Sequence, residues 1–450
     1  MESIKVPKDV MYILDTLNQN GYEAYVVGGC VRDCLLGKRP NDWDIATSAM
    51  PQQVKALFPR TYDTGIKHGT VTVIINAKSF EITTYRLDGK YQDHRRPSEI
   101  QFTQNIVKDL KRRDFTMNAI AYHPYKGLAD PFDGRKDIKA KLIKCVGLAG
   151  ERFREDALRM LRAVRFSSQL NFAIEQNTLQ AICENGKLIT KVSQERIREE
   201  LNKVLLSEYP EKLLRMHETK ILAYILPEFE RCLHTPQNHP YHAYDVGNHS
   251  IAAVRNIEKD IVLRWTMLLH DIGKPVCRTT DEQGIDHFYG HGQQSTILAK
   301  KVLTRLRFDK KTTENILGLI KWHDRPIHPT PRAVKKAVRV IGEGIFYDLL
   351  KVKEADIKAQ NPALKEKRLE DIKVIRDIFD DIQRSGQCIS IKDLAVNGKD
   401  LLAIGVRQGK EVGMVLEKLL DIVIESPEKN NRETLTALAK AFYERLYMGR

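Results

Sequence analysis

The first part of the chain alternates between two spacings of hydrophobic residues. Apolar runs in "EAYVVGG", "DWDIAT" and "TVTVIINAKSFEITTYR" predict strands, the last of them a hairpin that turns at residues 76–79. Helical spacing in "MESIKVPKDVMYIL" and "CVRDCLLG" predicts helices. The polar, aperiodic residues 85–102 predict a mobile loop. Together these patterns indicate an α+β head with a mixed sheet and helices.

Strand patterns largely stop after residue 148. In "REDALRMLRAVRFSSQL", Leu158, Leu161 and Val164 recur at helical spacing, and helical patterns continue along the rest of the sequence. The polar stretches "HTPQNHPYHAYD", "DRPIHPTPRA" and "SGQCISI" interrupt them. We therefore expect a mostly α-helical body after the head.

The charge of the chain adds a candidate partner to this picture. The 450 residues carry a formal net charge of +14, which indicates an anionic partner, with nucleic acid foremost. No apolar run approaches the roughly 18 residues of a membrane span, and the N-terminal segment has no signal-peptide core. The seven cysteines form no Cys-x-x-Cys pair. The sequence thus predicts no zinc ribbon, disulfide framework or membrane, and a reducing cytoplasm.

Candidate chemistry begins where the first strand meets its helix. Gly28 and Gly29 would let a phosphate approach the backbone at a helix start. Arg32, on the following helix, would reach that phosphate. A pair of glycines is also compatible with an ordinary turn, so this motif alone leaves both interpretations open.

Two carboxylates follow on the next expected strand. Asp42 and Asp44 would share one face of that strand, with Trp43 packed on the other. Carboxylates this close repel each other unless a cation lies between them, and Mg²⁺ prefers oxygen ligands. Glu81, on the neighbouring hairpin, is a candidate third ligand. The alternative is a solvated strand end, but the nearby phosphate turn favours a two-metal site for nucleotidyl transfer.

A helical segment carries candidates for reading a base. In "GERFREDALRMLRAVRF", Asp156, Arg159 and Arg162 fall along one side of an expected helix, and Arg165 follows three residues later. These residues suit ordinary i,i+3 and i,i+4 ion pairs. They are also suited to base recognition, since Asp accepts from an exocyclic amine and Arg donates to a ring acceptor. Such a pair would read cytosine or adenine and reject uracil and guanine.

A shorter motif lies between these two groups. In "KRRDFTMNAIAY", Arg113 is a candidate for phosphate binding, and Asp114 or Asn118 for hydrogen bonding to a ribose hydroxyl. The alternative for Asp114 is a helix N-cap.

The motifs "VVGGCVRD…NDWDIAT", "RRDFTMNAIAY" and "EDALRMLRAVRF" resemble the bacterial and eukaryotic class of CCA-adding tRNA nucleotidyltransferases and their poly(A) polymerase relatives, over about residues 20–230. The resemblance implies Mg²⁺-dependent addition of C, C and A to the tRNA 3′ end from CTP and ATP, with release of pyrophosphate. It implies that Gly29 and Arg32 bind the triphosphate, that Asp42 and Asp44 hold the metals, and that Arg113 contacts the nucleotide. It also implies that Asp156 and Arg159 form a protein template for the base, which Arg162 and Arg165 support. Residues 193–205 would steady the template, and residues 85–102 would serve the C-to-A switch.

A second family resemblance covers about residues 238–360. His249, His270-Asp271, His291, His323 and Asp356 are spaced along expected helices, as in the HD phosphohydrolase superfamily. The resemblance implies that His249, His270, Asp271 and Asp356 are the core metal ligands, with His291 and His323 as the extra pair of two-metal members. Imidazole and carboxylate ligands suit Mn²⁺, Fe²⁺, Ni²⁺ or Zn²⁺. The implied reaction is hydrolysis of a phosphoester.

These resemblances imply four domains: a catalytic head (1–148), a helical neck (149–235), an HD domain (236–362) and a tRNA-binding tail (363–450). The motifs do not separate full CCA addition from poly(A) synthesis or from addition of only CC or only A. An HD phosphohydrolase with an RNA-binding head is an alternative of another class, and a non-catalytic tRNA-binding protein is a third.

Overall fold

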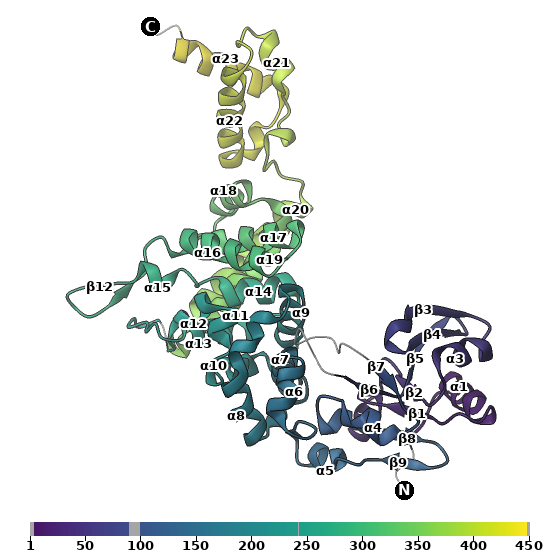
Figure 1. Ribbon diagram of the computed structural model, residues 1–450. Coiled ribbons are helices and arrows are strands. Elements are labelled where there is room, and N and C mark those ends of the chain that lie inside the picture. Colours follow the sequence, from purple (N-terminus) through teal and green to yellow (C-terminus); the bar gives the residue numbers. More distant parts are fainter. Residues whose placement is uncertain (1–3, 90–99, 242, 448–450) are drawn as a thin grey trace. The chain divides into compact units, whose positions relative to one another are not determined.

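The computed structural model describes residues 4–89, 100–241 and 243–447 (Figure 1). Packing divides the chain into two compact units, each of which is described by itself. Unit 1 comprises Met1–Glu230 with Arg305–Arg307, and unit 2 comprises Arg231–Thr304 with Phe308–Arg450. The four-domain division remains a prediction.

A seven-stranded sheet forms the centre of the head in unit 1. Its strand order is β3-β4-β5-β2-β1-β8-β9. The β2–β5 pair is parallel and the other neighbours are antiparallel, which confirms the predicted mixed sheet. The strands are β1 (Ala24–Val27), β2 (Ile45–Thr47), β3 (Thr61–Gly65), β4 (Thr70–Ile75), β5 (Lys78–Thr84), β8 (Ala121–His123) and β9 (Gly127–Ala129).

The expected strand over "DWDIAT" is shorter than its sequence suggested. Only Ile45–Thr47 joins the sheet as β2, and all three residues are buried. Asp42, Trp43 and Asp44 precede the strand in irregular backbone. The alternation of faces that a strand imposes therefore does not govern these three side chains.

The predicted hairpin is confirmed, with a tighter turn than expected. Ile75 pairs with Lys78, so only Asn76 and Ala77 form the turn. Both have positive φ, 49° and 61°, as a type I′ turn requires. Alternation along β5 then buries Phe80 and Ile82 and leaves Glu81 exposed.

The expected loop over residues 85–102 is structured at both ends. Tyr85 is fully buried, and β6 (Arg86–Asp88) pairs with β7 (Ile100–Phe102) in an antiparallel ladder. Residues 90–99, the middle of that prediction, lie outside the described residues.

Helices complete unit 1 and place the candidate site. In the head, α1 packs on β1 and α3 packs on β4 (Figure 1). The helices are α1 (Lys8–Gln19), α2 (Gly29–Leu35), α3 (Pro51–Leu57), α4 (Ile106–Lys111), α5 (Gly134–Lys139), α6 (Ala149–Glu155), α7 (Leu158–Leu170), α8 (Gln176–Asn185), α9 (Gln194–Leu205), α10 (Leu214–Glu218) and α11 (Leu222–Ile225), while α12 (Pro227–Cys232) runs across the boundary between units. Two-residue strands β10 (Leu142–Ile143) and β11 (Ala173–Ile174) pair in parallel.

Unit 2 is mostly helical, as predicted. Its helices are α13 (Val246–Arg255), α14 (Ile261–Leu269), α15 (Lys274–Cys277), α16 (His291–Arg305), α17 (Lys310–Trp322), α18 (Pro331–Ile341), α19 (Glu343–Lys358), α20 (Glu366–Arg384), α21 (Gly398–Ala403), α22 (Lys410–Glu425) and α23 (Arg432–Tyr447). A short ribbon, β12 (Thr279–Thr280) and β13 (Asp286–His287), precedes α16. Around the last helices, a separate hydrophobic cluster buries Leu401, Leu419, Val423 and Leu435.

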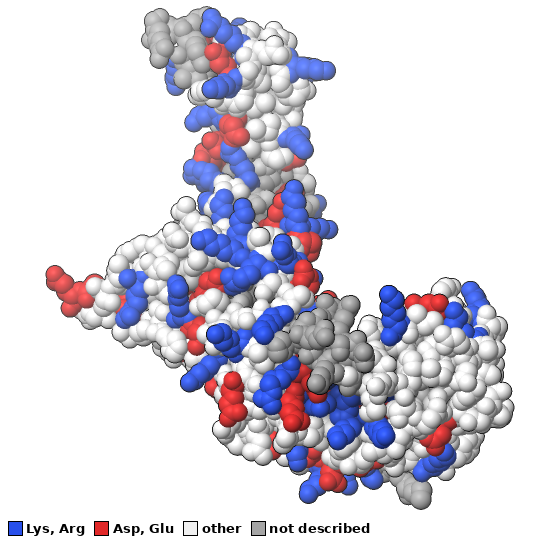
Figure 2. Space-filling view, in the orientation of Figure 1, with Lys and Arg blue, Asp and Glu red and all other residues white. Residues whose placement is uncertain are grey.

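Within the described residues, no helix is both long enough and apolar enough to cross a membrane. Figure 2 shows Lys and Arg side chains spread over the face drawn, with carboxylates between them. On the face drawn, the positive charge therefore does not by itself mark one binding surface.

Candidate functional site

A cleft in unit 1 gathers most of the residues predicted to bind a nucleotide. Its volume is about 470 Å³. The predicted residues that line it are Gly28, Gly29, Arg32, Asp44, Arg113, Asp114, Asn118, Asp156, Arg159, Arg162 and Arg165. The cleft also contains Arg112, Phe166 and Arg196, which the motifs did not single out. Asp42 and Glu81 do not line it.

The turn from β1 to α2 requires its first glycine. Gly28 has φ +80°, and a Cβ there would lie 2.8 Å from Nη1 of Arg113. A side chain would therefore force that guanidinium away from the turn. The close approach sets Arg113 beside the backbone where the sequence predicts a phosphate.

A chain of polar contacts runs from α2 to α7. Arg32 Nη1 donates to Asn118 Oδ1 at 2.7 Å, and Asn118 Nδ2 donates to Asp114 Oδ1 at 3.1 Å. Arg162 Nε donates to Asp114 Oδ2 at 2.7 Å. Burial alone would raise the pKa of Asp114, but Arg162 and Asn118 outweigh it and lower that pKa to about 2. Asp114 is thus an ionised, buried anchor for Arg162.

Asp114 does not cap an α-helix, the alternative considered from the sequence. It precedes a short 3₁₀ turn, η2 (Thr116–Asn118). Its Oδ1 accepts from the N–H of Phe115 at 2.8 Å. Both of its carboxylate oxygens therefore have partners within the protein.

The remaining arginines of α7 are held by the protein. Arg159 forms an ion pair with Glu155 at 2.5 Å and also donates to the backbone carbonyls of Arg152 and Arg112. Arg165 forms an ion pair with Glu200 of α9 at 2.6 Å, and its guanidinium lies 3.9 Å from the centre of the Phe166 ring. These contacts fix the direction of each guanidinium before any ligand arrives.

Asp156 does not lie on one continuous helix with these arginines, contrary to the prediction. Helix α6 ends at Glu155, and Asp156 has extended backbone angles, φ −139° and ψ 104°. Asp156 Oδ1 accepts from the N–H of Leu158 at 3.0 Å, at the start of α7. Arg196 of α9 forms an ion pair with Asp156 at 2.8 Å. The helical periodicity of the sequence continues in phase across this break. That pattern therefore could not reveal that the first helix ends at Glu155.

The three predicted catalytic carboxylates are placed differently from one another. Asp44 lines the cleft, and its backbone carbonyl accepts from the N–H of Val27 at 3.0 Å. The β2–β5 register pairs Ile45 with Ile82, and extending it by one residue places Asp44 beside Glu81. Asp42 and Trp43 instead line a separate hollow in the head. The expectation that Asp42 and Asp44 share one face is therefore wrong, because these residues are not in a strand, and Trp43 lines the same hollow as Asp42.

The charges of these carboxylates fit a divalent cation. Partial enclosure by the protein raises the pKa of Asp44; Arg113 opposes this and Asp42 adds to it. Asp42, Asp44 and Glu81 have no ion-pair partner among the described residues. Within the described residues, the carboxylate oxygens of Asp42, Asp44 and Glu81 do not form a tight three-ligand cluster. Neighbouring carboxylates that no cationic side chain pairs with match the donors that Mg²⁺ prefers.

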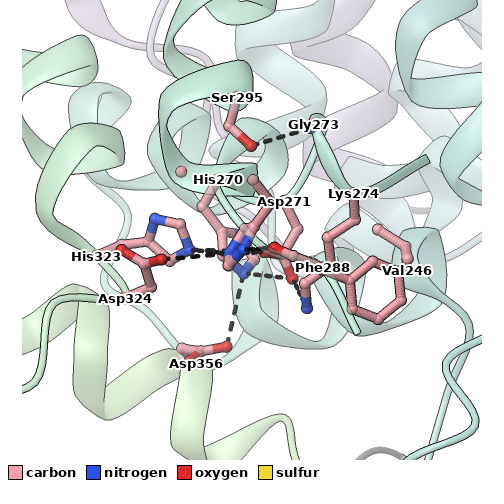
Figure 3. A network of polar contacts seen from close by, with 12 residues as sticks. Val246, His270, Asp271, Gly273, Lys274, Phe288, Ser295, His323, Asp324 and Asp356 are labelled. Carbon is pink, nitrogen blue, oxygen red and sulfur yellow. Dashed lines mark hydrogen bonds and ion pairs between the residues drawn. The ribbon is translucent and has the colours of Figure 1, made fainter. Parts of the chain in front are cut away.

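Unit 2 brings together all six residues of the histidine motif. His249 lies in α13, His270 and Asp271 follow α14, His291 begins α16, His323 follows α17, and Asp356 lies in α19. His249 Nε2 lies 2.8 Å from Asp356 Oδ1, and His270 Nε2 lies 3.2 Å from Asp271 Oδ2. Figure 3 shows His270, Asp271, His323 and Asp356 pointing toward one another.

Three of these imidazoles have the same orientation. The Nδ1 atoms of His270, His291 and His323 lie 2.8, 2.9 and 2.7 Å from the backbone carbonyl three residues before each of them. A proton on Nδ1 would donate to that carbonyl and leave the Nε2 lone pair facing the other ligands. Hydrogen bonding of this kind orients metal-binding histidines.

The centre of this cluster fits a transition metal. His270 Nε2 and Asp271 Oδ2 are buried without a hydrogen-bond partner of acceptable geometry. Burial would raise the pKa of Asp271, yet His270 and Lys274 hold it well below its ordinary value. Two described triads have ligand atoms within 4.8 Å of one another: His249, His270 and Asp271, and Asp271, His291 and His323. Buried nitrogen and oxygen donors converging in this way suit Mn²⁺, Fe²⁺ or Ni²⁺.

Comparison with known proteins identifies relatives of the whole chain. Family models match residues 24–144 as "Poly A polymerase head domain", 171–233 as "Probable RNA and SrmB-binding site of polymerase A", and 279–439 as tRNA nucleotidyltransferase domain 2. CCA-adding enzymes of Lactobacillus helveticus and Lactobacillus johnsonii are 33% and 35% identical, each over 94% of both chains. That of Lactobacillus delbrueckii subsp. bulgaricus is 54% identical over 44% of this chain and half of its own length.

Solved structures agree with these matches. The crystal structure of Bacillus stearothermophilus CCA-adding enzyme in complex with CTP is 29% identical, with a TM-score of 0.73 over 98% of this chain and 99% of that one. The Thermotoga maritima CCA-adding enzyme complexed with tRNA shares the fold, at 20% identity and a TM-score of 0.61.

Proposed function

This chain belongs to the family of CCA-adding enzymes, within the poly(A) polymerase-like nucleotidyltransferases, and from that premise we propose that it adds C, C and A to the 3′ end of tRNA. CTP and ATP supply the nucleotides, and pyrophosphate leaves. The observation that carries the proposal is the cleft of unit 1, where eleven predicted residues from separate motifs meet.

The cleft supplies groups for each part of a nucleoside triphosphate. The Gly28–Gly29 turn offers backbone N–H groups to phosphate oxygens, and Arg32 and Arg113 supply charge beside that turn. Asp42 and Asp44, with Glu81 as a third candidate, would hold Mg²⁺. That metal, when bound, supplies a lowered pKa for the attacking 3′-hydroxyl and neutralises the leaving pyrophosphate.

Base choice is assigned to Asp156 and Arg159. The Asp156 carboxylate would accept from the exocyclic amine of cytosine or adenine, and Arg159 would donate to the neighbouring ring acceptor. Support for this assignment is the position of both side chains in the cleft. Asp114 supports it indirectly by holding Arg162, and Asn118 is the candidate contact for the ribose.

The decisive experiment uses tRNA that lacks its last three nucleotides, with labelled CTP and ATP. Addition of three nucleotides and no more is expected. Long A tails would identify a poly(A) polymerase, and a stop after two residues would identify a CC-adding enzyme. Addition of A only to tRNA that already ends in CC would identify an A-adding enzyme. No addition at all would favour the HD phosphohydrolase with an RNA-binding head, or a non-catalytic tRNA-binding protein.

Asp42→Ala should abolish incorporation of both CTP and ATP in that assay, because the metal loses a ligand. The matched control is Asp63→Ala, an exposed carboxylate of the same head that pairs with Lys55. Incorporation by Asp42→Ala at the rate of the control would remove Asp42 from the metal site.

Asp156→Ala should change base choice more than rate, because it removes the acceptor for the amine and leaves the carboxylates that hold the metal. The measurement is incorporation of each of the four nucleoside triphosphates at equal concentration. Discrimination against UTP and GTP equal to that of the wild type would contradict the template role.

A second activity is supported by the histidine cluster of unit 2. We infer an HD-type site at which His249, His270, Asp271, His291, His323 and Asp356 would hold one or two ions of Mn²⁺, Fe²⁺ or Ni²⁺. Such ions supply a hydroxide nucleophile for phosphoester hydrolysis. A test is hydrolysis of a 2′,3′-cyclic nucleotide and of a phosphomonoester, before and after chelation and with each metal restored. A fully chelated protein of undiminished activity would contradict the metal assignment.

The proposed partners are tRNA, CTP and ATP, and the proposed compartment is the cytoplasm. The described residues contain no helix that suits a membrane span.

A further inference from the structure

A hollow in the head lies next to the catalytic carboxylates but outside the nucleotide cleft. Its volume is about 1370 Å³. Three segments wall it: residues 4–9 at the start of α1, residues from 34 to 43 at the end of α2 and beyond it, and residues 77–80 at the turn of the β4–β5 hairpin. This exceeds the roughly 300–1,000 Å³ of a typical small-molecule pocket, so the hollow suits a longer ligand than one nucleotide.

The walls of this hollow carry an excess of positive charge. Lys5, Lys8, Lys38 and Arg39 line it and are exposed. None of the four side chains has an ion pair with a described residue. By contrast, Lys78 at the same rim pairs with Asp9 at 2.9 Å. Four free cations around one hollow attract a polyanion rather than an acidic side chain of this protein.

Trp43 adds an aromatic surface to these charges. It lines the hollow and is partly exposed. No hydrogen bond, ring contact or cation–π contact involves it among the described residues. A base can therefore stack on the indole without displacing a protein group, and stacking of this kind binds single-stranded nucleic acid.

The two carboxylates on either side of Trp43 line different spaces. Asp44 lines the arginine-rich cleft, and Asp42 lines the basic hollow. A metal held between them would therefore lie between two ligand spaces. Because the triphosphate already has arginines and a glycine turn in the cleft, the hollow is left for the other substrate.

We propose that this hollow binds the single-stranded 3′ end of the RNA, with Trp43 stacking on a base near the terminus and Lys38 and Arg39 contacting backbone phosphates. The assignment rests on the proposed function. The proposal adds a separate surface for the RNA terminus. On this proposal, the RNA in the hollow and the nucleotide in the cleft would both border the carboxylates Asp42 and Asp44.

The first test compares Lys38→Ala/Arg39→Ala with the wild type. The matched control is Lys139→Ala, an exposed lysine of the head that does not line the hollow. The probe is tRNA ending in CC, and its affinity is measured over a range of salt concentrations. The double variant should lower the slope of log affinity against log salt by about 1.4, for two lost single-strand phosphate contacts. Its KM for the nucleotide should equal that of the control.

The second test uses the emission of Trp43. RNA with a single-stranded 3′ end should quench tryptophan emission of the wild type more than that of Trp43→Phe, and a blunt RNA duplex should cause no such difference. Trp43→Ala should weaken binding of the single-stranded end roughly 5- to 150-fold. Retained CTP binding and circular dichroism show whether each variant is folded.

Several outcomes would overturn the proposal. These are wild-type RNA affinity in the double variant, an equal loss in Lys139→Ala, a raised KM for CTP with unchanged RNA affinity, or equal quenching by the blunt duplex. A wild-type protein that adds no nucleotide would contradict the proposed function instead, and the binding measurements would still decide what the hollow holds.

Discussion

At the residue scale, the Asp114–Arg162 ion pair is a contact that should be sensitive to substitution. The Asp114 side chain is 8% exposed and that of Arg162 is 34% exposed. Asp114→Asn should lower the free energy of unfolding by about 3 kcal/mol, the low end for breaking a buried pair, since water reaches Arg162. Urea unfolding of the variant and of the wild type measures this difference in the free energy of unfolding. The exposed pair Lys55–Asp63 supplies the control Asp63→Asn, expected to change stability by less than about 1 kcal/mol.

The same pair gives a pH dependence with a definite sign. The pKa of Asp114 is lowered from 3.8 to about 2 in the folded protein. Its contribution to stability is therefore present above about pH 4 and is lost as the pH falls toward 2. The free energy of unfolding of the wild type should decrease over that range more steeply than that of Asp114→Asn. Parallel curves would show that Asp114 does not titrate in this way.

Most individual residues of the cleft could be predicted from the sequence, because the type of a side chain indicates which group it can bind. Arg32, Arg113 and Asn118 meet where their motifs suggested. Residues 193–205 were expected to steady the template, but Arg196 was not singled out within them, since its partner Asp156 is forty residues away in sequence and no local pattern links the two. The shared face expected for Asp42 and Asp44 was wrong because it was derived from a strand that begins only at Ile45.

At the element scale, the β4–β5 turn offers a direct test of backbone strain. Ala77 has φ 61°, a conformation that costs an L-residue roughly 1 kcal/mol and costs glycine little. Ala77→Gly should raise the free energy of unfolding of unit 1 by about 1 kcal/mol and create the Asn-Gly turn typical of such hairpins. Ala56→Gly in α3, where φ is helical, should lower it. A loss of stability in Ala77→Gly would contradict the turn geometry.

A helix or strand was predictable where its own pattern of hydrophobic residues set it apart. It was not predictable where two helices share one continuous pattern. Alternation predicted the hairpin, and Pro7, which disfavours helical backbone at Val6 and is itself the N-cap, explains why the first helix begins no earlier than Lys8. The break between α6 and α7 carries no glycine or proline. Its one local signal is Asp156, whose carboxylate accepts from the N–H of Leu158 as an N-cap would.

At the scale of the whole molecule, the two units carry different tryptophans and different candidate metal sites. Trp43 lies in unit 1, and Trp265 and Trp322 lie in unit 2. In Trp43→Phe, tryptophan emission would report unit 2 alone. Mn²⁺ at about 100 times its dissociation constant should then stabilise that transition by about 2.7 kcal/mol.

His270→Ala supplies the control for this experiment. His270 is fully buried at the centre of the cluster, so its removal should abolish the stabilisation by Mn²⁺. An equal shift in both proteins would place the ion elsewhere.

The ion pair between Asp156 and Arg196 gives the carboxylate proposed to read the base a partner within the protein. In the proposed recognition, an incoming base must displace the Arg196 guanidinium before Asp156 accepts its amine. Cytosine and adenine bring an exocyclic amine beside a ring acceptor for that exchange, whereas uracil has no exocyclic amine and leaves the Asp156–Arg196 pair intact. Discrimination against uracil would then arise from competition with a side chain of the protein itself, while guanine, which has an amine, would be rejected by the ring N–H that it presents to Arg159.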